Sequence, residues 1–166
     1  RGMSHHEDAF RITAVFGGAS GFLRLHGGGP SGSDSLTVNG TPLADVITLT
    51  LAQAGDTLAG VVGGPTTAVG IEHLIVEGGA AVDVYAVNNF GGLSDLNDVT
   101  FNTAAVGDDT ITVAGTVNPD DIHVTPTSAT RVEATANGRG PWLVANLSAA
   151  VASTYTVGGA ASNDKV

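Results

Sequence analysis

Three stretches of the chain alternate apolar and polar residues in the same way, and each stretch contains a glycine-led turn between two alternating runs. Alternation with a period of two is typical of β-strands that bury one face. The first apolar positions of the three copies, Leu36, Leu74 and Ile111, are separated by 38 and 37 residues. Internal repetition at such a period predicts a repeat architecture. The copies lie near residues 34–49, 72–87 and 109–124.

Strand-like runs recur roughly every 12 residues, so each repeat contains about three strands. This spacing predicts an all-β fold, and more specifically a β-solenoid, a right-handed parallel β-helix with ~37-residue repeats. An antiparallel β-sandwich is the alternative, because regular short strands are equally typical of that class. The identity of the copies favours the solenoid.

The length of 166 residues is that of one domain. Residues 1–10 show no repeat, and we expect an N-terminal arm or a tag remnant there, in which His5 and His6 would attract zinc or nickel adventitiously. Residues 11–166 are then a single β-repeat domain, whose residues 126–166 form a C-terminal cap where the pattern decays. We expect this domain to be a piece of a larger protein.

Composition narrows the function classes. Aromatic residues make up only 5% of the chain, so the core must consist mainly of small aliphatic side chains. The formal net charge is −10 and the only lysine is Lys165, which argues against a nucleic-acid partner because phosphates would be repelled. Cysteine is absent, which excludes disulfides. No apolar run approaches the ~20 residues of a membrane-spanning helix, so we expect no membrane insertion.

Acidic residues recur two positions before the first apolar residue of a strand. A carboxylate at that place can accept hydrogen bonds from turn amides or coordinate a hard cation such as calcium. Turn capping is the favoured interpretation, and calcium binding stays open. The candidate calcium ligands are Asp34, Asp45, Asp83, Asp109 and Asp120, with Asp108 and Asp121 as second carboxylates.

Glycines precede these acids at a constant spacing. The segments are Gly29-x4-Asp34-x-Leu36, Gly40-x4-Asp45-x-Ile47, Gly78-Gly79-x3-Asp83-x-Tyr85 and Gly115-x4-Asp120-x-Ile122. Over roughly residues 27–124 they resemble, in degenerate form, the haemolysin-type nonapeptide of repeats-in-toxin proteins. The resemblance implies a bacterial secreted or cell-surface protein with calcium in its turns. Leu43, Ala81 and Asn118 stand where that family has its third glycine, and other strands separate the nonapeptides. The resemblance therefore supports a secreted or surface location more strongly than it supports calcium binding.

The leading functional expectation is a noncatalytic structural or adhesive module that acts as a rigid spacer or self-associating scaffold, with calcium as its only candidate cofactor. Its partners would be further copies, neighbouring modules, or a cell-surface or polysaccharide ligand. The alternative is a carbohydrate-active or carbohydrate-binding parallel β-helix, in which paired carboxylates such as Asp108-Asp109 and Asp120-Asp121 would serve as general acid and base.

Two further observations bear on that alternative. Few aromatic rings are available to stack on sugars, and we expect Trp142 to cap the end of the core. The histidines His26, His73 and His123 lie in different phases of the repeat, so their spacing assembles no catalytic triad.

Overall fold

A computed structural model describes residues 7–13, 23–28, 33–53, 55–62, 64–103, 107–148 and 153–158. This part of the chain consists of strands and turns, without a helix that has the length and apolarity of a membrane span. The strands are β1 (Ala9–Thr13), β2 (Leu23–His26), β3 (Ser35–Asn39), β4 (Val46–Thr50), β5 (Asp56–Val62), β6 (Gly64–Val69), β7 (His73–Glu77), β8 (Val84–Phe90), β9 (Asp98–Asn102), β10 (Thr110–Gly115), β11 (Ile122–Ser128), β12 (Arg131–Ala136), β13 (Arg139–Asn146) and β14 (Thr154–Gly158).

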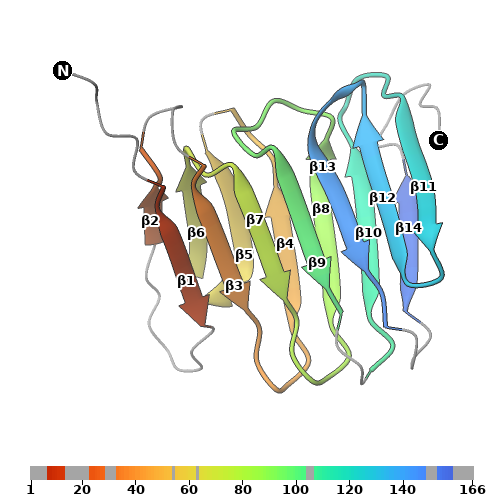
Figure 1. The fold of residues 1–166 in the computed structure, drawn as a ribbon, viewed down its shortest axis with the longest axis horizontal. Helices are drawn as coiled ribbons and strands as arrows, with labels where there is room; N and C mark the ends of the chain where they lie inside the picture. The colour runs from red at the N-terminus through yellow and green to blue at the C-terminus, as the bar shows by residue number, and fades with distance from the viewer. Residues whose placement is uncertain are drawn as a thin grey trace.

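The strands form two sheets that face each other as two layers (Figure 1). The first, sheet A, has the order β1-β3-β7-β9-β13-β12-β11, and the second, sheet B, has the order β14-β10-β8-β4-β5-β6-β2. Consecutive strands β7, β8, β9 and β10 lie alternately in sheets A and B, so that each strand pairs in parallel with the strand two positions away in sequence. The expected all-β class is therefore confirmed.

Two antiparallel segments make both sheets mixed. The hairpin β5–β6 is inserted into sheet B beside β4, and β11 and β12 extend sheet A beyond β13. Eight of the twelve described strand pairs are parallel and four are antiparallel. The fold is thus neither a uniformly parallel helix nor the antiparallel sandwich that was the alternative.

The three sequence copies do not stack as three equivalent layers. Leu36 pairs with Leu74 across β3 and β7, but Leu74 pairs next with Val99 of β9. Ile111 lies in the other sheet, where it pairs with Tyr85. The 38-residue interval contains β4 and the inserted hairpin β5–β6, whereas the 37-residue interval contains only β8 and β9 as whole strands of the described part. Nearly equal spacings therefore arise from different structures, and the expected alignment of the third copy is wrong.

The core lies between the inward faces of the two sheets. Leu36 and Leu74 of sheet A and Ile47 and Ile111 of sheet B are at most 1% exposed, as the alternating pattern predicts. The few rings fill the centre: Tyr85 and Phe101 pack across the sheets with centroids 5.2 Å apart and planes at 55°. Small aliphatic side chains supply most of the remaining interior.

The chain ends differ in part from the expected boundaries. Strand β1 begins at Ala9, inside residues 1–10, and Phe10 packs against the core, so the last residues of the expected arm belong to the sheet. His5 and His6 lie outside the described residues. Within the expected cap, β12 and β13 continue sheet A, and residues 149–152 and 159–166 lie outside the described part.

Glycines occupy the corners where the chain crosses between sheets. A Cβ atom at Gly40 would lie 1.9 Å from the carbonyl oxygen of Gly78 in the neighbouring corner, and one at Gly27 would lie 1.9 Å from that of Gly70. Such distances are far below van der Waals contact with rigid backbone. Neighbouring corners can therefore approach this closely only where no side chain is present.

We predict that Gly40→Ala lowers the free energy of unfolding by about 1–3 kcal/mol, because the corner must open to admit the methyl group. Gly158→Ala is the matched control, since a Cβ there meets nothing within 4 Å. Urea unfolding followed by circular dichroism measures both variants. Equal stabilities for the two variants would show that the corners are not sterically closed.

Candidate functional site

Three buried aspartates line up at the starts of β4, β8 and β10, and we call Asp45, Asp83 and Asp109 the aspartate row. The N–H of Asp45 donates to Asp83 Oδ1 at 2.8 Å, and the N–H of Asp83 donates to Asp109 Oδ1 at 2.7 Å. The carboxylates of Asp83 and Asp109 therefore each satisfy an amide of the adjacent strand's corner. Buried backbone amides need such partners, because an unpaired one is costly away from water.

Sheet A repeats this interaction at the starts of β3 and β7. The N–H of Asp8 donates to Asp34 Oδ1 at 2.7 Å, and the N–H of Asp34 donates to Glu72 Oε2 at 2.8 Å. The partners in the two sheets are 26 or 38 residues apart in sequence. The recurring acids of the sequence thus mark hydrogen bonds between neighbouring strands of one sheet.

The same carboxylates, with others, also cap turns within their own segment. Asp45 accepts the N–H of Thr41 at 2.6 Å, and Asp120 accepts the N–H of Thr116 at 2.5 Å. The threonine hydroxyls donate to the same carboxylates. Each acid thereby closes a turn that begins four residues earlier, which is the turn-capping interpretation favoured from the sequence.

The seven candidate calcium ligands do not gather into one cluster, although Asp45, Asp83 and Asp109 lie in a row. Asp109 and Asp120 are at most 3% exposed, whereas their neighbours Asp108 and Asp121 are exposed, because successive side chains point to opposite faces of an extended chain. Asp121 lies beside His123, with 3.6 Å between Oδ1 and Nε2. Among the described residues no group of three or more His, Cys, Asp or Glu is placed to hold a metal ion.

The same alternation of side chains separates Asp108 from Asp109, the proposed acid and base of the carbohydrate-active alternative. Asp108 faces solvent and Asp109 is fully buried, accepting the amide of Asp83. The two carboxylates therefore cannot flank one glycosidic bond, and this pairing is wrong.

Burial among like charges shifts the titration of Asp83, the middle residue of the aspartate row. The pKa of Asp83 is raised chiefly by its burial, with further contributions from the negative charges of Asp109 and Asp45, and the N–H of Asp45 opposes the rise. Burial also raises the pKa of Tyr85, whose hydroxyl lies 3.5 Å from Asp83 Oδ2. Asp83 therefore binds a proton in the folded state more readily than an exposed carboxylate would.

A Ser-His-Asp constellation lies where strands β7 and β9 of sheet A begin, although the spacing of these residues in the sequence did not predict one. Ser33 Oγ is 2.7 Å from His73 Nε2, and Asp98 Oδ2 is 2.6 Å from His73 Nδ1. His73 and Asp98 begin the neighbouring strands β7 and β9 in register. These contacts have the connectivity of a catalytic triad.

The surroundings of this constellation oppose acyl transfer. The amide that follows the serine, the N–H of Asp34, donates to the carboxylate of Glu72 at 2.8 Å. An oxyanion hole needs such a donor free and aimed at the developing negative charge. Ser33 is also exposed. We interpret the three residues as a surface hydrogen-bond chain; His26 and His123 belong to other strands, β2 and β11.

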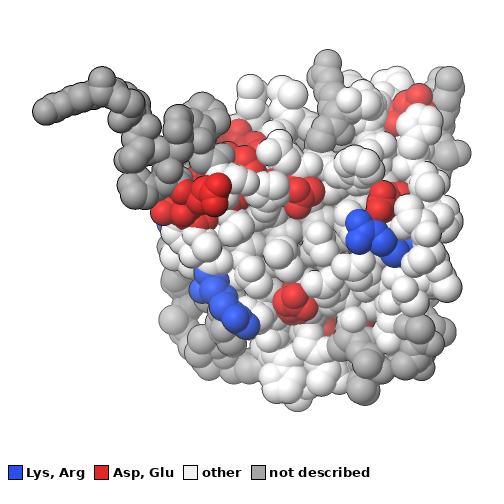
Figure 2. All heavy atoms as spheres, in the orientation of Figure 1, with Lys and Arg blue, Asp and Glu red and all other residues white. Residues whose placement is uncertain are grey.

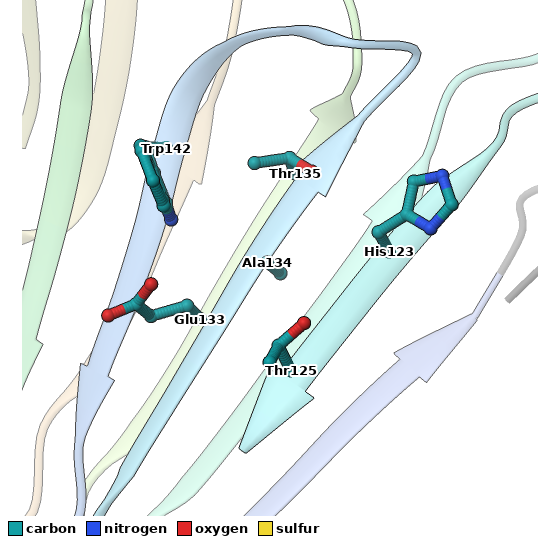
Figure 3. Close-up of a pocket in the computed structure, with 6 residues that line it drawn as sticks. All are labelled: His123, Thr125, Glu133, Ala134, Thr135 and Trp142. Carbon is teal, nitrogen blue, oxygen red and sulfur yellow. The ribbon is translucent and has the colours of Figure 1, made fainter. Parts of the chain in front are cut away.

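Trp142 lies on the outward face of sheet A, and we call the area around this side chain the Trp142 surface. This side chain is 53% exposed, so the expectation that it caps the core is wrong. Hollows of about 220 and 360 Å³ adjoin it, and both are also lined by Glu133. Figure 3 shows Trp142 and Glu133 on one side of the first hollow and His123 and Thr125 on the other.

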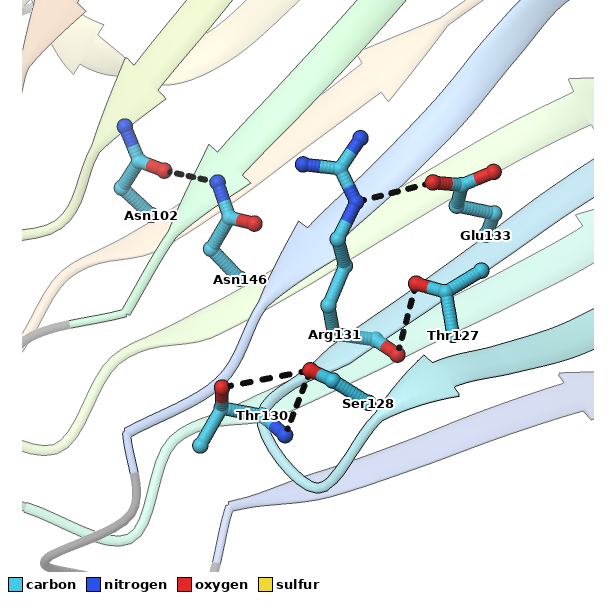
Figure 4. Close-up of polar contacts among 7 residues, drawn as sticks. All are labelled: Asn102, Thr127, Ser128, Thr130, Arg131, Glu133 and Asn146. Atoms are coloured by element: carbon cyan, nitrogen blue, oxygen red, sulfur yellow. Dashed lines mark hydrogen bonds and ion pairs between the residues drawn. The ribbon is translucent and has the colours of Figure 1, made fainter.

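Polar contacts hold the margins of this surface. Arg131 Nε donates to Glu133 Oε1 at 2.8 Å, and Asn146 Nδ2 donates to Asn102 Oδ1 at 2.6 Å (Figure 4). Asn102 in turn donates to Glu77 at 2.9 Å, so that an amide ladder runs across β7, β9 and β13. On this face the charged groups are sparse and scattered among uncharged ones (Figure 2).

Comparison with known proteins adds no relative. The sequence matches no protein family, and neither curated proteins nor solved structures yield a similar chain. The site must therefore be interpreted from its own geometry.

We predict a pH-dependent gain in stability for Asp56→Asn. Burial raises the pKa of Asp56 from 3.8 to about 6, against the donors Ala52 N–H and Ser94 Oγ, so the folded state takes up protons between these two values. Stability from this group is present below pH 3.8 and is lost as the pH rises through about 6. Relative to the natural protein, Asp56→Asn should become more stable across that window.

Urea unfolding at several pH values measures this difference. Ser94→Ala is the companion variant, because it removes a hydrogen bond that lowers the pKa of Asp56 and should steepen the loss of stability with pH. A difference between Asp56→Asn and the natural protein that does not change with pH would refute the assignment.

Proposed function

We propose that this chain is a noncatalytic structural and adhesive module of a secreted or cell-surface protein. In this proposal the two sheets are a flattened β-solenoid whose coil has two strands, one in each sheet, and is interrupted by two antiparallel segments. The observation that carries the proposal is the hydrogen bond from each corner amide to the carboxylate of the next coil, as from Asp45 to Asp83 and from Asp83 to Asp109.

Stiffness follows from this arrangement. Each coil contacts mainly its neighbours, so that stability accumulates along the stack as in other repeat proteins. Charged hydrogen bonds between corners are stronger than neutral ones and are directional. Closely packed glycine corners, such as Gly40 against Gly78, leave little room for one coil to slide over another. A stack of this kind transmits force with little deformation and suits a spacer.

The ends of the stack support self-association. Strands β1 and β2 lie at one end of the two sheets and β11 and β14 at the other (Figure 1). Among the described residues, the outer edges of these strands have no strand partner. An open edge can pair with a strand of another chain or module. We therefore propose end-to-end contacts with further copies or with neighbouring modules of the same protein.

Secretion is supported by composition and by the degenerate repeats described above. A net charge of −10 keeps such modules soluble and apart until a specific contact forms. The absence of cysteine is compatible with this location, since hydrogen bonds between the corners stabilise the fold where small secreted domains use disulfides.

Self-association tests the proposed scaffold. We predict that the mass measured by light scattering rises with protein concentration, and that Thr156→Lys on the edge strand β14 reduces this rise, since lysine on an edge disfavours strand addition. Thr112→Lys is the matched control, because Thr112 pairs with Thr156 but lies on the interior strand β10. A monomer at every concentration, or equal effects of both substitutions, would contradict end-to-end assembly.

Calcium binding is tested by calorimetric unfolding in calcium and in chelator. We predict equal melting temperatures, because the buried carboxylates already accept amide hydrogen bonds. A calcium-dependent rise that is abolished by the combined substitutions Asp45→Asn, Asp83→Asn and Asp120→Asn would instead assign these corners to the metal.

A further inference from the structure

The Trp142 surface combines one large exposed ring with short polar side chains. Trp142 pairs in register with Asp98 of β9, and on its other side the outward-facing Thr135 of β12 lies opposite His123 of β11. The first hollow lies over β11, β12 and β13, and the second over β9, β12 and β13. Trp142 therefore borders both hollows, which adjoin each other on the outward face of sheet A.

We propose that this surface binds a chain of neutral hexopyranoses, with a sugar ring stacked on the indole of Trp142. The proposal rests on the proposed function and supplies the ligand of its adhesive part. The C–H face of a pyranose is apolar and fits the negative face of an aromatic ring, while its hydroxyls require hydrogen-bond partners around the rim. Glu133 and Asp98 offer acceptors there, and Thr100, Thr125 and Thr135 offer hydroxyls.

The paired hollows favour a chain over a single sugar. Both are lined by Trp142 and Glu133, so that one ligand can enter both while it passes the indole. The first hollow lies on the outward face of sheet A, over β11, β12 and β13 (Figure 3). An extended oligosaccharide crossing the strands makes contacts in both, and its affinity accumulates from adjacent sugar units.

The negative charge of the Trp142 surface disfavours anionic polysaccharides. The carboxylates that line the two hollows belong to Asp98 and Glu133, and Arg131 is paired with Glu133 at 2.8 Å. A uronic acid or a sulfated sugar would meet these carboxylates, against which the linings hold only Arg131, already paired with Glu133, and the imidazole of His123, whereas neutral hydroxyls donate readily to carboxylates.

A protein partner fits this surface less well. A protein interface needs a contiguous apolar centre. Among the residues that the structure describes, the other exposed large hydrophobic side chains line neither hollow, and they are Leu23, Leu43, Val46, Val82, Val84, Leu93 and Val117. Trp142 is thus a single ring among polar groups, which is the arrangement that a sugar ring requires.

The intrinsic fluorescence of Trp142 tests the proposal directly, because it is the only tryptophan of the chain. The probes are cellohexaose, maltohexaose, laminarihexaose and mannohexaose, with polygalacturonate as the anionic comparison. We expect at least one neutral probe to shift the emission to shorter wavelength in a saturable way, since stacking removes water from an exposed indole. Polygalacturonate should produce no shift.

Isothermal calorimetry with the bound probe then compares variants. Trp142→Ala should weaken binding about tenfold or more, as expected for a central aromatic contact, and Trp142→Phe should recover part of the affinity. Val117→Ala is the control, because Val117 is 77% exposed and lines neither hollow, so that its truncation should leave binding unchanged.

Three results would overturn the proposal: no neutral probe binds, binding persists undiminished in Trp142→Ala, or Trp142→Ala dissolves a self-associated form that the probes do not affect. The last result assigns the surface to a protein contact. Failure of sugar binding leaves the scaffold intact if the Thr156→Lys and Thr112→Lys variants still differ in assembly. Failure of assembly with retained sugar binding rejects the scaffold alone.

Discussion

The structure depends on the hydrogen bond between a buried carboxylate and the backbone amide of the neighbouring corner. A chain that crosses repeatedly between two sheets buries amides at every crossing, where no strand partner is available for them. In this protein Asp34, Asp83 and Asp109 accept such amides, and the glycine corners provide the close approach that the bond requires. Removing either the acid or the glycine would leave buried polar groups unpaired.

This arrangement stores negative charge inside the protein. The aspartate row places three carboxylates on adjacent strands, and burial raises the pKa of Asp83 as a consequence. Several charged and directional bonds offset the cost of burying the charges, and they also set the register of the strands. The acids that look like metal ligands in the sequence are therefore used largely for architecture, and the outward faces are left to contact other molecules.

The outward face of sheet A carries both surface features that sequence reasoning missed. Ser33, His73 and Asp98 meet although they are far apart in the chain, because β3, β7 and β9 are neighbours in one sheet. Trp142 was expected in the core because it lies where the repeat pattern decays. In β13 the side chain of Trp142 points outward, because its neighbours Pro141 and Leu143 are buried and successive side chains of a strand face opposite sides. The alternation of the sequence could have indicated this orientation.

The sequence by itself determined the strand class, the inward positions and the places of the capping acids. These are local properties: alternation marks a face, and an acid four residues after a turn residue such as Thr41 or Thr116 caps that turn wherever the segment lies. Only the tertiary structure decided which sheet each strand joins. Both sheets bury one face and so impose the same alternation, which is why Ile111 was aligned with Leu74 although it pairs with Tyr85. The mixed strand directions and the surface around Trp142 follow from that choice of neighbours, which short connections leave undetermined.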